Sequence, residues 1–258
     1  MIVRRANLSV LGGALALVLL LAGSVAPAEA QEAETGEWVS IFNGENFDGW
    51  HLSVESSHSS ASNHESAGDW KVENGVMMGR QSPDIPGNGG LVITDEQYGD
   101  FEIKLEMRND FGPDSGIFLR STEDGTAYQV NIDYRAGGTL GGVYGEGLGG
   151  DPNIENFVFD GGPNQIAEVD APTDLPIIPE AWPYFWDHHE WQEVRARIEG
   201  NPPTVTSWVN GVKIMEYTDD ELRHQDEGGI ALQVHGGTDV PSGDGWVRYR
   251  NIMVREIE

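Results

Sequence analysis

The 258-residue chain carries 43 acidic and 15 basic residues, a formal net charge of −28, and it contains no cysteine. A surface this acidic repels the phosphates of nucleic acids and the anionic headgroups of membranes. We therefore expect neither nucleic acids nor membranes as partners. Without cysteine there is no disulfide framework and no thiol chemistry, and the length is normal for a single all-β domain.

The first 30 residues have the composition of an export signal. Arg4-Arg5 forms a positive n-region, an apolar stretch follows over residues 8–22, and Ala28-Glu29-Ala30 is a small-x-small cleavage site. The apolar stretch is short for a membrane-spanning helix. We therefore expect cleavage before Gln31 and one mature domain over residues 31–258, located in the periplasm or secreted and free of the membrane. The two arginines suit a twin-arginine signal as well as a Sec n-region, and we favour Sec.

The beginning of the mature chain alternates strands with turns. Residues 38–42 form a first predicted strand, and residues 69–80 form a hairpin with Asn74-Gly75 as its two-residue turn. Between them, residues 53–68 are rich in serine and contain two isolated histidines, His58 among them. This composition predicts a flexible loop whose histidines are solvated and bind no metal.

The next predicted hairpin, residues 115–134, carries an unusual polar row. Asp124-Gly125 supplies its turn. In its second strand, the residues facing one way are Tyr128, Val130, Ile132 and Tyr134, and those facing the other are Gln129, Asn131 and Asp133. The preceding strand at residues 100–108 has instead an ordinary outer face of mixed charges. With Arg120 nearby, the polar row fits the floor of a polar site as well as a wet face of an antiparallel sheet.

Residues 145–190 are long, rich in glycine and proline, and without a sustained period. Their aromatic content argues against disorder, and loops of this length in a compact domain are usually functional. We predict an ordered excursion that covers the polar face, with Trp182 or Trp186 at its rim. Three glycines at 145–150 have G-x-G-x-x-G spacing, but no βαβ unit surrounds them, so they do not predict a dinucleotide site.

The last part of the chain contains several more predicted strands. Residues 204–209 and 212–218 form a hairpin around Asn210-Gly211, and residues 246–257 form the final strand. In residues 229–235 the alternation places Ile230, Leu232 and Val234 in the core and Ala231, Gln233 and His235 on the opposite face. Many short strands with turn residues between them predict an all-β fold, a two-sheet antiparallel jelly-roll sandwich.

Several sequence blocks, taken together and in order, resemble a known family. They are WVSIFNGENFDGW at 38–50, WKVENGVMMG at 70–79, YGDFEIKLEMRNDFGPDSGIFLR at 98–120, WVNGVKIMEY at 208–217, GIALQVHGG at 229–237 and VRYRNIMVREI at 247–257. The set resembles the 3-keto-disaccharide hydrolase domain family. The resemblance covers nearly the whole mature chain and implies a concanavalin A-like jelly roll, export, and action on oxidised sugars. The segments at 53–67 and 145–190 depart from the family pattern.

The implied reaction needs a base, a group that stabilises an enolate, and an acid. A ketone at C3 acidifies the hydrogen at C2, its removal gives an enolate, the group at C1 leaves, and water then adds. We predict Asp133 or His235 as the base and Arg120 as the holder of the oxyanion. A structural ion pair is the alternative role for Arg120.

Other side chains are predicted to bind the sugar or a metal ion. The substrate-binding candidates are Gln129, Asn131, Gln233, Tyr144, Trp182, Trp186 and His188. His188 and its neighbour His189 are alternative acids, or they merely flank the following strand. A divalent cation could stabilise the enolate instead, with Asp133, His235 and Glu146 as candidate ligands.

Two other functions suit the same predicted fold. A non-catalytic, lectin-like carbohydrate-binding module would use the amide row and the aromatic residues for binding alone. A jelly-roll endoglucanase would place paired carboxylates two or four residues apart on one strand, and the expected E-x-D-x-x-E run is absent. In each case the expected partner is a carbohydrate, while nothing in the sequence indicates an oligomeric state.

Overall fold

The computed structural model describes residues 36–149, 152–171, 173–221, 223–239 and 244–258. The predicted export signal and its cleavage site lie outside these residues. The strands belong to one compact unit, Ala33–Glu258. Within the described part of the chain, no helix is both long enough and apolar enough to cross a membrane.

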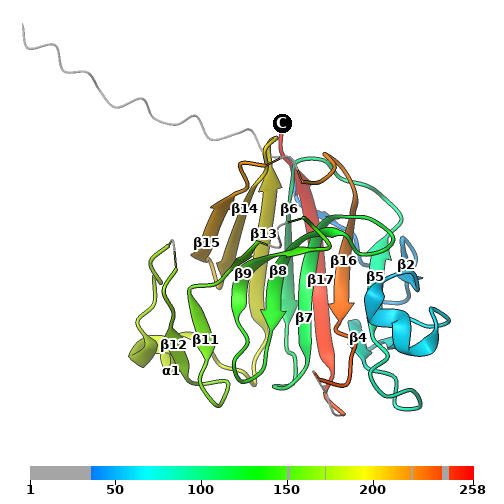
Figure 1. The fold of residues 1–258 in the computed structure, drawn as a ribbon, viewed down its shortest axis with the longest axis horizontal. Coiled ribbons are helices and arrows are strands. Elements are labelled where there is room, and N and C mark those ends of the chain that lie inside the picture. Colours follow the sequence, from blue (N-terminus) through cyan, green and yellow to red (C-terminus); the bar gives the residue numbers. More distant parts are fainter. Residues whose placement is uncertain (1–35, 150–151, 172, 222, 240–243) are drawn as a thin grey trace, which may run out of the picture. The chain divides into compact units, whose positions relative to one another are not determined.

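Two large antiparallel sheets pack face to face, which confirms the predicted all-β sandwich (Figure 1). The strands of the first sheet, in spatial order, are β15 (Val212–Thr218), β14 (Thr204–Val209), β13 (Gln192–Glu199), β6 (Phe101–Met107), β17 (Val247–Glu256), β4 (Val76–Arg80) and β3 (Asp69–Glu73), with β1 (Val39–Ser40) also paired to β17. Those of the second sheet are β10 (Asn153–Ile154), β9 (Leu140–Glu146), β8 (Ala127–Asp133), β7 (Asp114–Ser121), β16 (Gly229–Val234), β5 (Gly90–Thr94) and β2 (Trp50–Ser53).

The tight turns form where the sequence predicts them. Asn74 and Gly75 have φ angles of 53° and 81°, and Asn210 and Gly211 have φ angles of 47° and 78°. Two successive residues with positive φ make a turn whose twist matches that of the strands it joins, and asparagine and glycine tolerate this conformation best. The predicted β3–β4 and β14–β15 hairpins are therefore confirmed.

The predicted phase of the second sheet is also confirmed. Tyr128, Val130 and Ile132 of β8 are fully buried in the main core. Burial of each such side chain stabilises the fold by roughly 1.5–3 kcal/mol, and a one-residue slip would turn all of them to the other face. The core thus fixes Gln129 and Asp133 on the outer face of the second sheet, the face turned away from the sandwich core.

Residues 145–190 form several short elements, coloured yellow-green beside β9 in Figure 1. They are β10, β11 (Phe157–Phe159), β12 (Ile166–Glu168), the 3-10 helix η2 (Pro179–Ala181) and the one-turn helix α1 (Trp182–Phe185). Of these, β10 extends the second sheet at its edge, and β11 pairs with β12 in a small separate sheet.

The two tryptophans of this segment lie in the core, so their prediction as rim residues is wrong. Trp182 and Trp186 are 0% and 2% exposed, and their rings stack with centroids 5.6 Å apart. Trp182 Nε1 donates to the carbonyl of Pro163, and Trp186 Nε1 donates to the hydroxyl of Tyr134. Burial of the ring area with a partner for each N–H is the more stable arrangement for such large side chains.

The serine-rich segment at residues 53–68 is ordered, contrary to the prediction. It contains a 3-10 helix, η1 (Ser57–Ser62). Ser56 caps η1 by accepting from the backbone N–H of His58, and the Ser62 hydroxyl is bonded to the carbonyls of Ser59 and Ser66. Serine hydroxyls therefore hold the backbone here without sheet pairing, a local pattern that composition alone does not reveal.

Candidate active site

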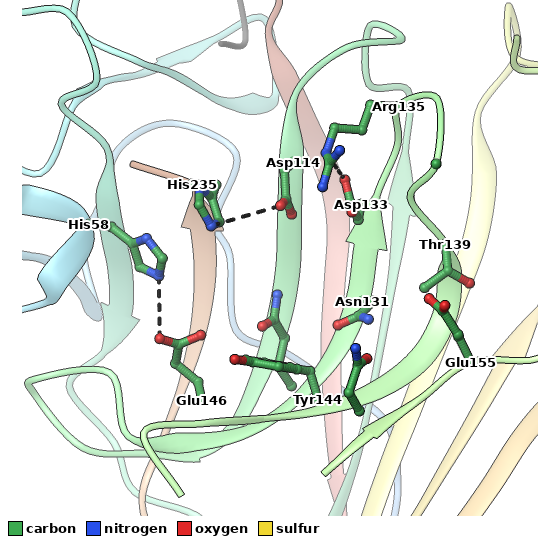
Figure 2. Close-up of a pocket in the computed structure, with 13 residues that line it drawn as sticks. His58, Asp114, Asn131, Asp133, Arg135, Thr139, Tyr144, Glu146, Glu155 and His235 are labelled. Atoms are coloured by element: carbon green, nitrogen blue, oxygen red, sulfur yellow. Dashed lines mark ion pairs between the residues drawn. The ribbon is translucent and has the colours of Figure 1, made fainter. Parts of the chain in front are cut away.

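A cavity of about 410 Å³ lies on the outer face of the second sheet (Figure 2). This volume is typical of small-molecule sites. Strands β7, β8, β9 and β10 supply most of its walls, and η1, the end of β16 and the connections that follow β8 and β10 supply the rest. The lining residues are His58, Asp114, Gln129, Asn131, Asp133, Arg135, Gly137, Thr139, Tyr144, Glu146, Asn153, Glu155 and His235.

Two buried carboxyl groups lie side by side in this pocket. Asp114 of β7 and Asp133 of β8 are directly opposite each other in the antiparallel register, an arrangement that places Cβ atoms about 4.5–5.5 Å apart. Burial raises the pKa of each to about 7, and mutual repulsion adds to the shift of Asp133. Two coupled carboxyls of this kind titrate as a pair, so near neutral pH they share one proton.

The surrounding charges make the two carboxyls unequal. The charge of Arg135 opposes the rise in the pKa of both carboxyls, and Arg135 Nε lies 2.8 Å from Asp133 Oδ1. His235 opposes the rise in the pKa of Asp133 as well. The charge of Glu146 adds to burial in raising the pKa of Asp114. We therefore interpret Asp133 as the ionised partner and Asp114 as the protonated one. This places a base and a proton donor beside a cation in one pocket.

His235 lies next to the carboxyl pair at the end of β16. Its Nε2 is 3.9 Å from Asp114 Oδ2, and its backbone N–H donates to the Asp114 carbonyl. Its Nδ1 is buried and has no hydrogen-bond partner. Asp133 and His235, predicted to share a pocket, therefore do so.

A second histidine, His58, enters the pocket from η1, and the expectation that it is solvated is wrong. It is 8% exposed, and its ring centroid is 4.7 Å from that of His235. Its Nδ1 accepts from the backbone N–H of Gly236, and its Nε2 is 3.8 Å from Glu146 Oε1. Burial, together with the proximity of His235, lowers its pKa to about 3, so this ring is neutral.

A close backbone approach holds His58 in place. A Cβ on Gly236 would lie 2.3 Å from the His58 carbonyl oxygen, and one on Gly89 would lie 2.1 Å from the Val234 carbonyl oxygen. Only glycine fits at either position. The glycine pairs at 89–90 and 236–237 are the feature of the sequence that could have indicated close packing of another segment against the ends of β5 and β16.

The predicted sugar-binding residues divide into two groups. Gln129, Asn131 and Tyr144 line the pocket. Gln233 is 1% exposed and lies behind the lining, where its amide accepts from Gln129 Nε2 and contacts His58 Nε2. Gln233 therefore orients its neighbours and does not face the pocket, contrary to the prediction.

Arg120 lies outside the pocket, so its assignment to the oxyanion is wrong. It is 2% exposed, donates to the carbonyls of Gly99 and Gly200, and pairs with Asp100 at 2.5 Å. Its φ is +55°, and the β16–β7 register shifts beside it. A bulge adds a residue and redirects the following side chain, which simple alternation does not anticipate. The structural ion pair is the role that its contacts support.

Replacing Arg120 is therefore expected to affect stability and not catalysis. Arg120→Met leaves the two carbonyls without their donor, so we expect the free energy of unfolding to fall by about 1–3 kcal/mol. Denaturant unfolding measures this loss, and steady-state kinetics on the folded variant should give unchanged kcat and KM. A large fall in kcat with normal stability would return Arg120 to the reaction.

The structure supports neither the predicted role of His188 in the pocket nor the predicted metal site. His188 lines a separate cavity with Arg108, Arg248 and its neighbour His189, away from the carboxyl pair. The candidate metal ligands Asp133, Glu146 and His235 do line the pocket. Among the described residues, however, no group of three or more His, Cys, Asp or Glu side chains is arranged to hold a metal ion.

The carboxyl pair should make stability depend on pH. Because folding raises the pKa of Asp114 from an unfolded value near 3.9 to about 7, its contribution to stability is fully present below about pH 4 and is lost as the pH rises through 7. Asp114→Asn keeps the shape of the protonated acid and cannot ionise. We expect its melting temperature to exceed that of the wild type at pH 8, with a smaller difference at pH 5. An equal difference at both pH values would contradict the assigned shift.

The chain belongs to the family of 3-keto-alpha-glucoside-1,2-lyase-like domains, whose model matches residues 37–255. A candidate glycosyl hydrolase from Parabacteroides distasonis has a similar structure, with 17% identity, a TM-score of 0.52, and coverage of 86% of this chain and 94% of that one. A protein with a galectin-like fold from Bacillus subtilis is 11% identical, with a TM-score of 0.51 and coverage of 88% and 98%. A carbohydrate-binding module from Bacillus subtilis is 14% identical, with a TM-score of 0.49 and coverage of 79% and 93%.

These structural likenesses, at 11–17% identity, concern the fold alone, and the galectin-like fold agrees with the predicted jelly-roll sandwich. No curated protein matches the sequence significantly. Membership of this family identifies a glycosidase-like domain, whose ligand is a carbohydrate.

Proposed function

We propose that this chain is an exported enzyme that cleaves the glycosidic bond of 3-keto-disaccharides or related 3-keto-glycosides by elimination followed by hydration. The observation that carries the proposal is the buried Asp114–Asp133 pair beside Arg135 and His235 in one pocket. The name of the family to which the chain belongs, a 1,2-lyase-like domain, agrees with an elimination step.

The first step removes the hydrogen at C2. Asp133, ionised beside Arg135, accepts this proton, and the electron pair of the broken C–H bond forms the enolate with the C3 ketone. C2 and C3 are neighbouring atoms, so the base and the group that stabilises the enolate oxygen must also be neighbours. Asp133 and Arg135 are 2.8 Å apart. Arg135 thus takes the role that the sequence had suggested for Arg120.

The second step breaks the bond between C1 and the leaving oxygen. The enolate electrons form a C1=C2 double bond, and the leaving oxygen takes a proton from Asp114 or from the adjacent His235. Water then adds across the double bond, with its hydroxyl at C1 and a proton at C2. The products are the 3-keto sugar and the free leaving group, so the net reaction is hydrolysis.

The pocket suits catalysis better than binding alone. Sugar-binding modules stack rings on exposed aromatic side chains, and Tyr144 is the single Phe, Tyr or Trp among the described lining residues. A carboxyl pair buried with raised pKa values costs stability, which a binding module has no reason to sacrifice. These two features favour the enzyme over the lectin-like module.

Reaction in heavy water tests the proposal. Elimination and rehydration should place deuterium at C2 of the released 3-keto sugar, as measured by NMR or mass spectrometry, and the matching unoxidised disaccharide should not be cleaved. A no-enzyme control corrects for spontaneous enolisation. Cleavage without deuterium at C2 would indicate direct displacement at C1, and binding without cleavage would favour the lectin-like alternative.

A further inference from the structure

One end of the pocket contains polar side chains that the proposed reaction does not use. Asn131, Thr139, Asn153 and Glu155 line the same cavity as the carboxyl pair. In Figure 2, Thr139 and Glu155 lie on the side of the pocket opposite His58 and Glu146. We call these four residues the distal cluster.

The distal cluster has unused hydrogen-bonding capacity. Thr139 is 1% exposed, and its Oγ1 has no hydrogen-bond partner. The side chains of Asn131 and Glu155, which are half-buried, and of Asn153, which is exposed, form no hydrogen bond or ion pair with any other described residue. A buried hydroxyl without a partner is unfavourable unless a ligand supplies one.

The backbone of β10 comes close to β9 at this end of the pocket. β10 pairs with β9 so that Asn153 lies opposite Tyr144, which brings residues of the 145–190 segment to the pocket edge. A Cβ on Gly142 would lie 2.8 Å from the carbonyl oxygen of Ile154 and 3.0 Å from Thr139 Cγ2. Glycine at position 142 therefore lets β10 and the Thr139 side chain approach β9 this closely.

The pocket is also longer than a single sugar ring requires. Its lining residues extend from the end of β16 across β7, β8 and β9 to β10. Four strand spacings of about 4.8 Å amount to roughly 19 Å, which exceeds one pyranose ring. The carboxyl pair on β7 and β8 occupies the middle of this span, so the β9–β10 end remains for a second unit.

We propose that the distal cluster is a subsite for a neutral second sugar unit, the unoxidised half of a disaccharide substrate. This inference rests on the function proposed above for the carboxyl pair. Sugar hydroxyls both donate and accept, which matches a set of two amides, one hydroxyl and one carboxylate. Four carboxyl residues and a single arginine line the pocket, so a uronic acid or a sugar phosphate would be repelled.

Two variants and two substrates test the subsite. Thr139→Val removes the hydroxyl with little change in volume, and Glu155→Gln removes the charge. For a 3-keto-disaccharide we expect kcat/KM to fall about 3- to 10-fold in Thr139→Val and about 10- to 100-fold in Glu155→Gln, the range for lost neutral and charged hydrogen bonds. For the matching methyl 3-keto-glucoside, which lacks a second sugar, both variants should retain wild-type kcat/KM. Thr204→Val and Glu216→Gln, on the other sheet, are matched controls.

A third substrate tests the charge, and direct binding separates this inference from the proposed function. The wild type should discriminate against a 3-keto-disaccharide whose second unit is a uronic acid, and Glu155→Gln should reduce that discrimination. Equal losses on the disaccharide and the methyl glycoside, or no loss on either, would overturn the subsite. If the wild type cleaves no 3-keto substrate, the proposed function fails. Calorimetry with the unoxidised disaccharide then decides the subsite: Thr139→Val must weaken its binding, and unchanged affinity refutes it.

Discussion

Asp133→Asn is expected to lower kcat on a 3-keto-disaccharide by about two to four orders of magnitude, the usual contribution of a general base. The amide cannot accept the C2 proton, while its size and position in β8 are retained. Because Arg135 would lose its anionic neighbour at 2.8 Å, the variant also tests the proposed base–cation unit. Steady-state kinetics and deuterium incorporation at C2 should fall together.

Asp114→Asn and His235→Gln are the informative comparisons for this prediction. If Asp114 donates the proton to the leaving oxygen, its variant should slow cleavage while exchange of C2 hydrogen in the intact substrate persists, because enolate formation needs only the base. A loss of exchange in Asp114→Asn with normal exchange in Asp133→Asn would reverse the two roles. A small loss in both would identify His235 as the base. Melting curves for each variant exclude a folding defect.

The activity of the wild type should depend on pH through the same pair. The carboxyls share one proton near neutral pH, and each has a pKa of about 7. The reactive form, with Asp133 ionised and Asp114 protonated, is lost at low pH when both are protonated and at high pH when both are ionised. We therefore expect a bell-shaped dependence of kcat/KM on pH. The two apparent pKa values of this profile belong to the coupled pair and not to either carboxyl alone.

Strand phase was the part of the site that the sequence could predict. The alternation in residues 127–134 and 229–235 placed Gln129, Asn131, Asp133 and His235 correctly on one face, because core burial enforces a period of two. Asp114 was missed since it begins β7, outside any complete period, and its position beside Asp133 depends on the register between two strands. Arg135 and Thr139 lie in the β8–β9 connection, which has no period.

The errors have specific physical causes. The prediction for Arg120 is wrong because the backbone of Arg120 itself lies in the left-handed region, which interrupts the alternation of side chains along β7. The aromatic residues of the 145–190 segment correctly indicated that the segment is ordered. They did not indicate whether their side chains would pack into the core or line the pocket. Trp182 and Trp186 extend the core, and the same segment contributes Asn153 and Glu155 to the pocket. His58 was misjudged because a serine-rich composition does not indicate that hydroxyls cap and hold the segment.

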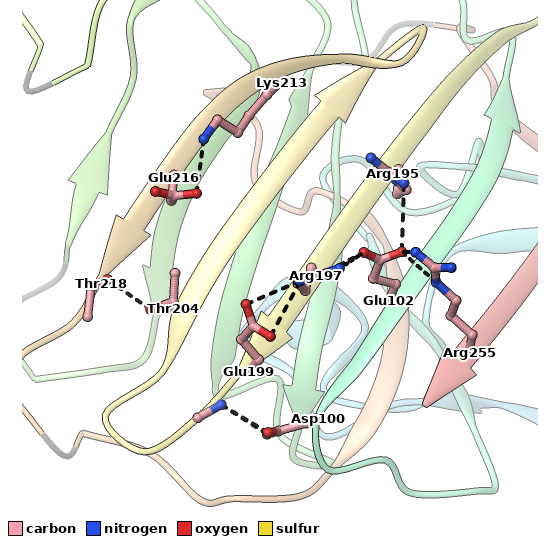
Figure 3. A network of polar contacts seen from close by, with 11 residues as sticks. Asp100, Glu102, Arg195, Arg197, Glu199, Thr204, Lys213, Glu216, Thr218 and Arg255 are labelled. Atoms are coloured by element: carbon pink, nitrogen blue, oxygen red, sulfur yellow. Dashed lines mark hydrogen bonds and ion pairs between the residues drawn. The ribbon is translucent and has the colours of Figure 1, made fainter. Parts of the chain in front are cut away.

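Glu102 of β6 is a buried acidic residue that forms ion pairs with three arginines of the first sheet (Figure 3). Its side chain is fully buried and forms ion pairs with Arg197 and Arg255, each at 2.5 Å, and with Arg195 at 3.8 Å. Arg195 and Arg197 lie on β13 and Arg255 on β17, the two strands that flank β6. One carboxylate thus joins three neighbouring strands, and its charge has no access to water as an alternative partner.

Glu102→Gln should therefore lower the free energy of unfolding by about 1.5–3 kcal/mol, because it replaces a buried, charged acceptor of the arginines with a neutral amide. Glu106→Gln is the matched control on the same strand. Its side chain is 34% exposed and, within the described part of the chain, forms an ion pair with Arg250 alone, so its loss should cost about 0–1 kcal/mol. Denaturant unfolding measures both values. Because Glu102 is on the sheet opposite the pocket, the folded variant should retain wild-type kcat and KM. Equal losses in the two variants would show that water or local rearrangement compensates the arginines.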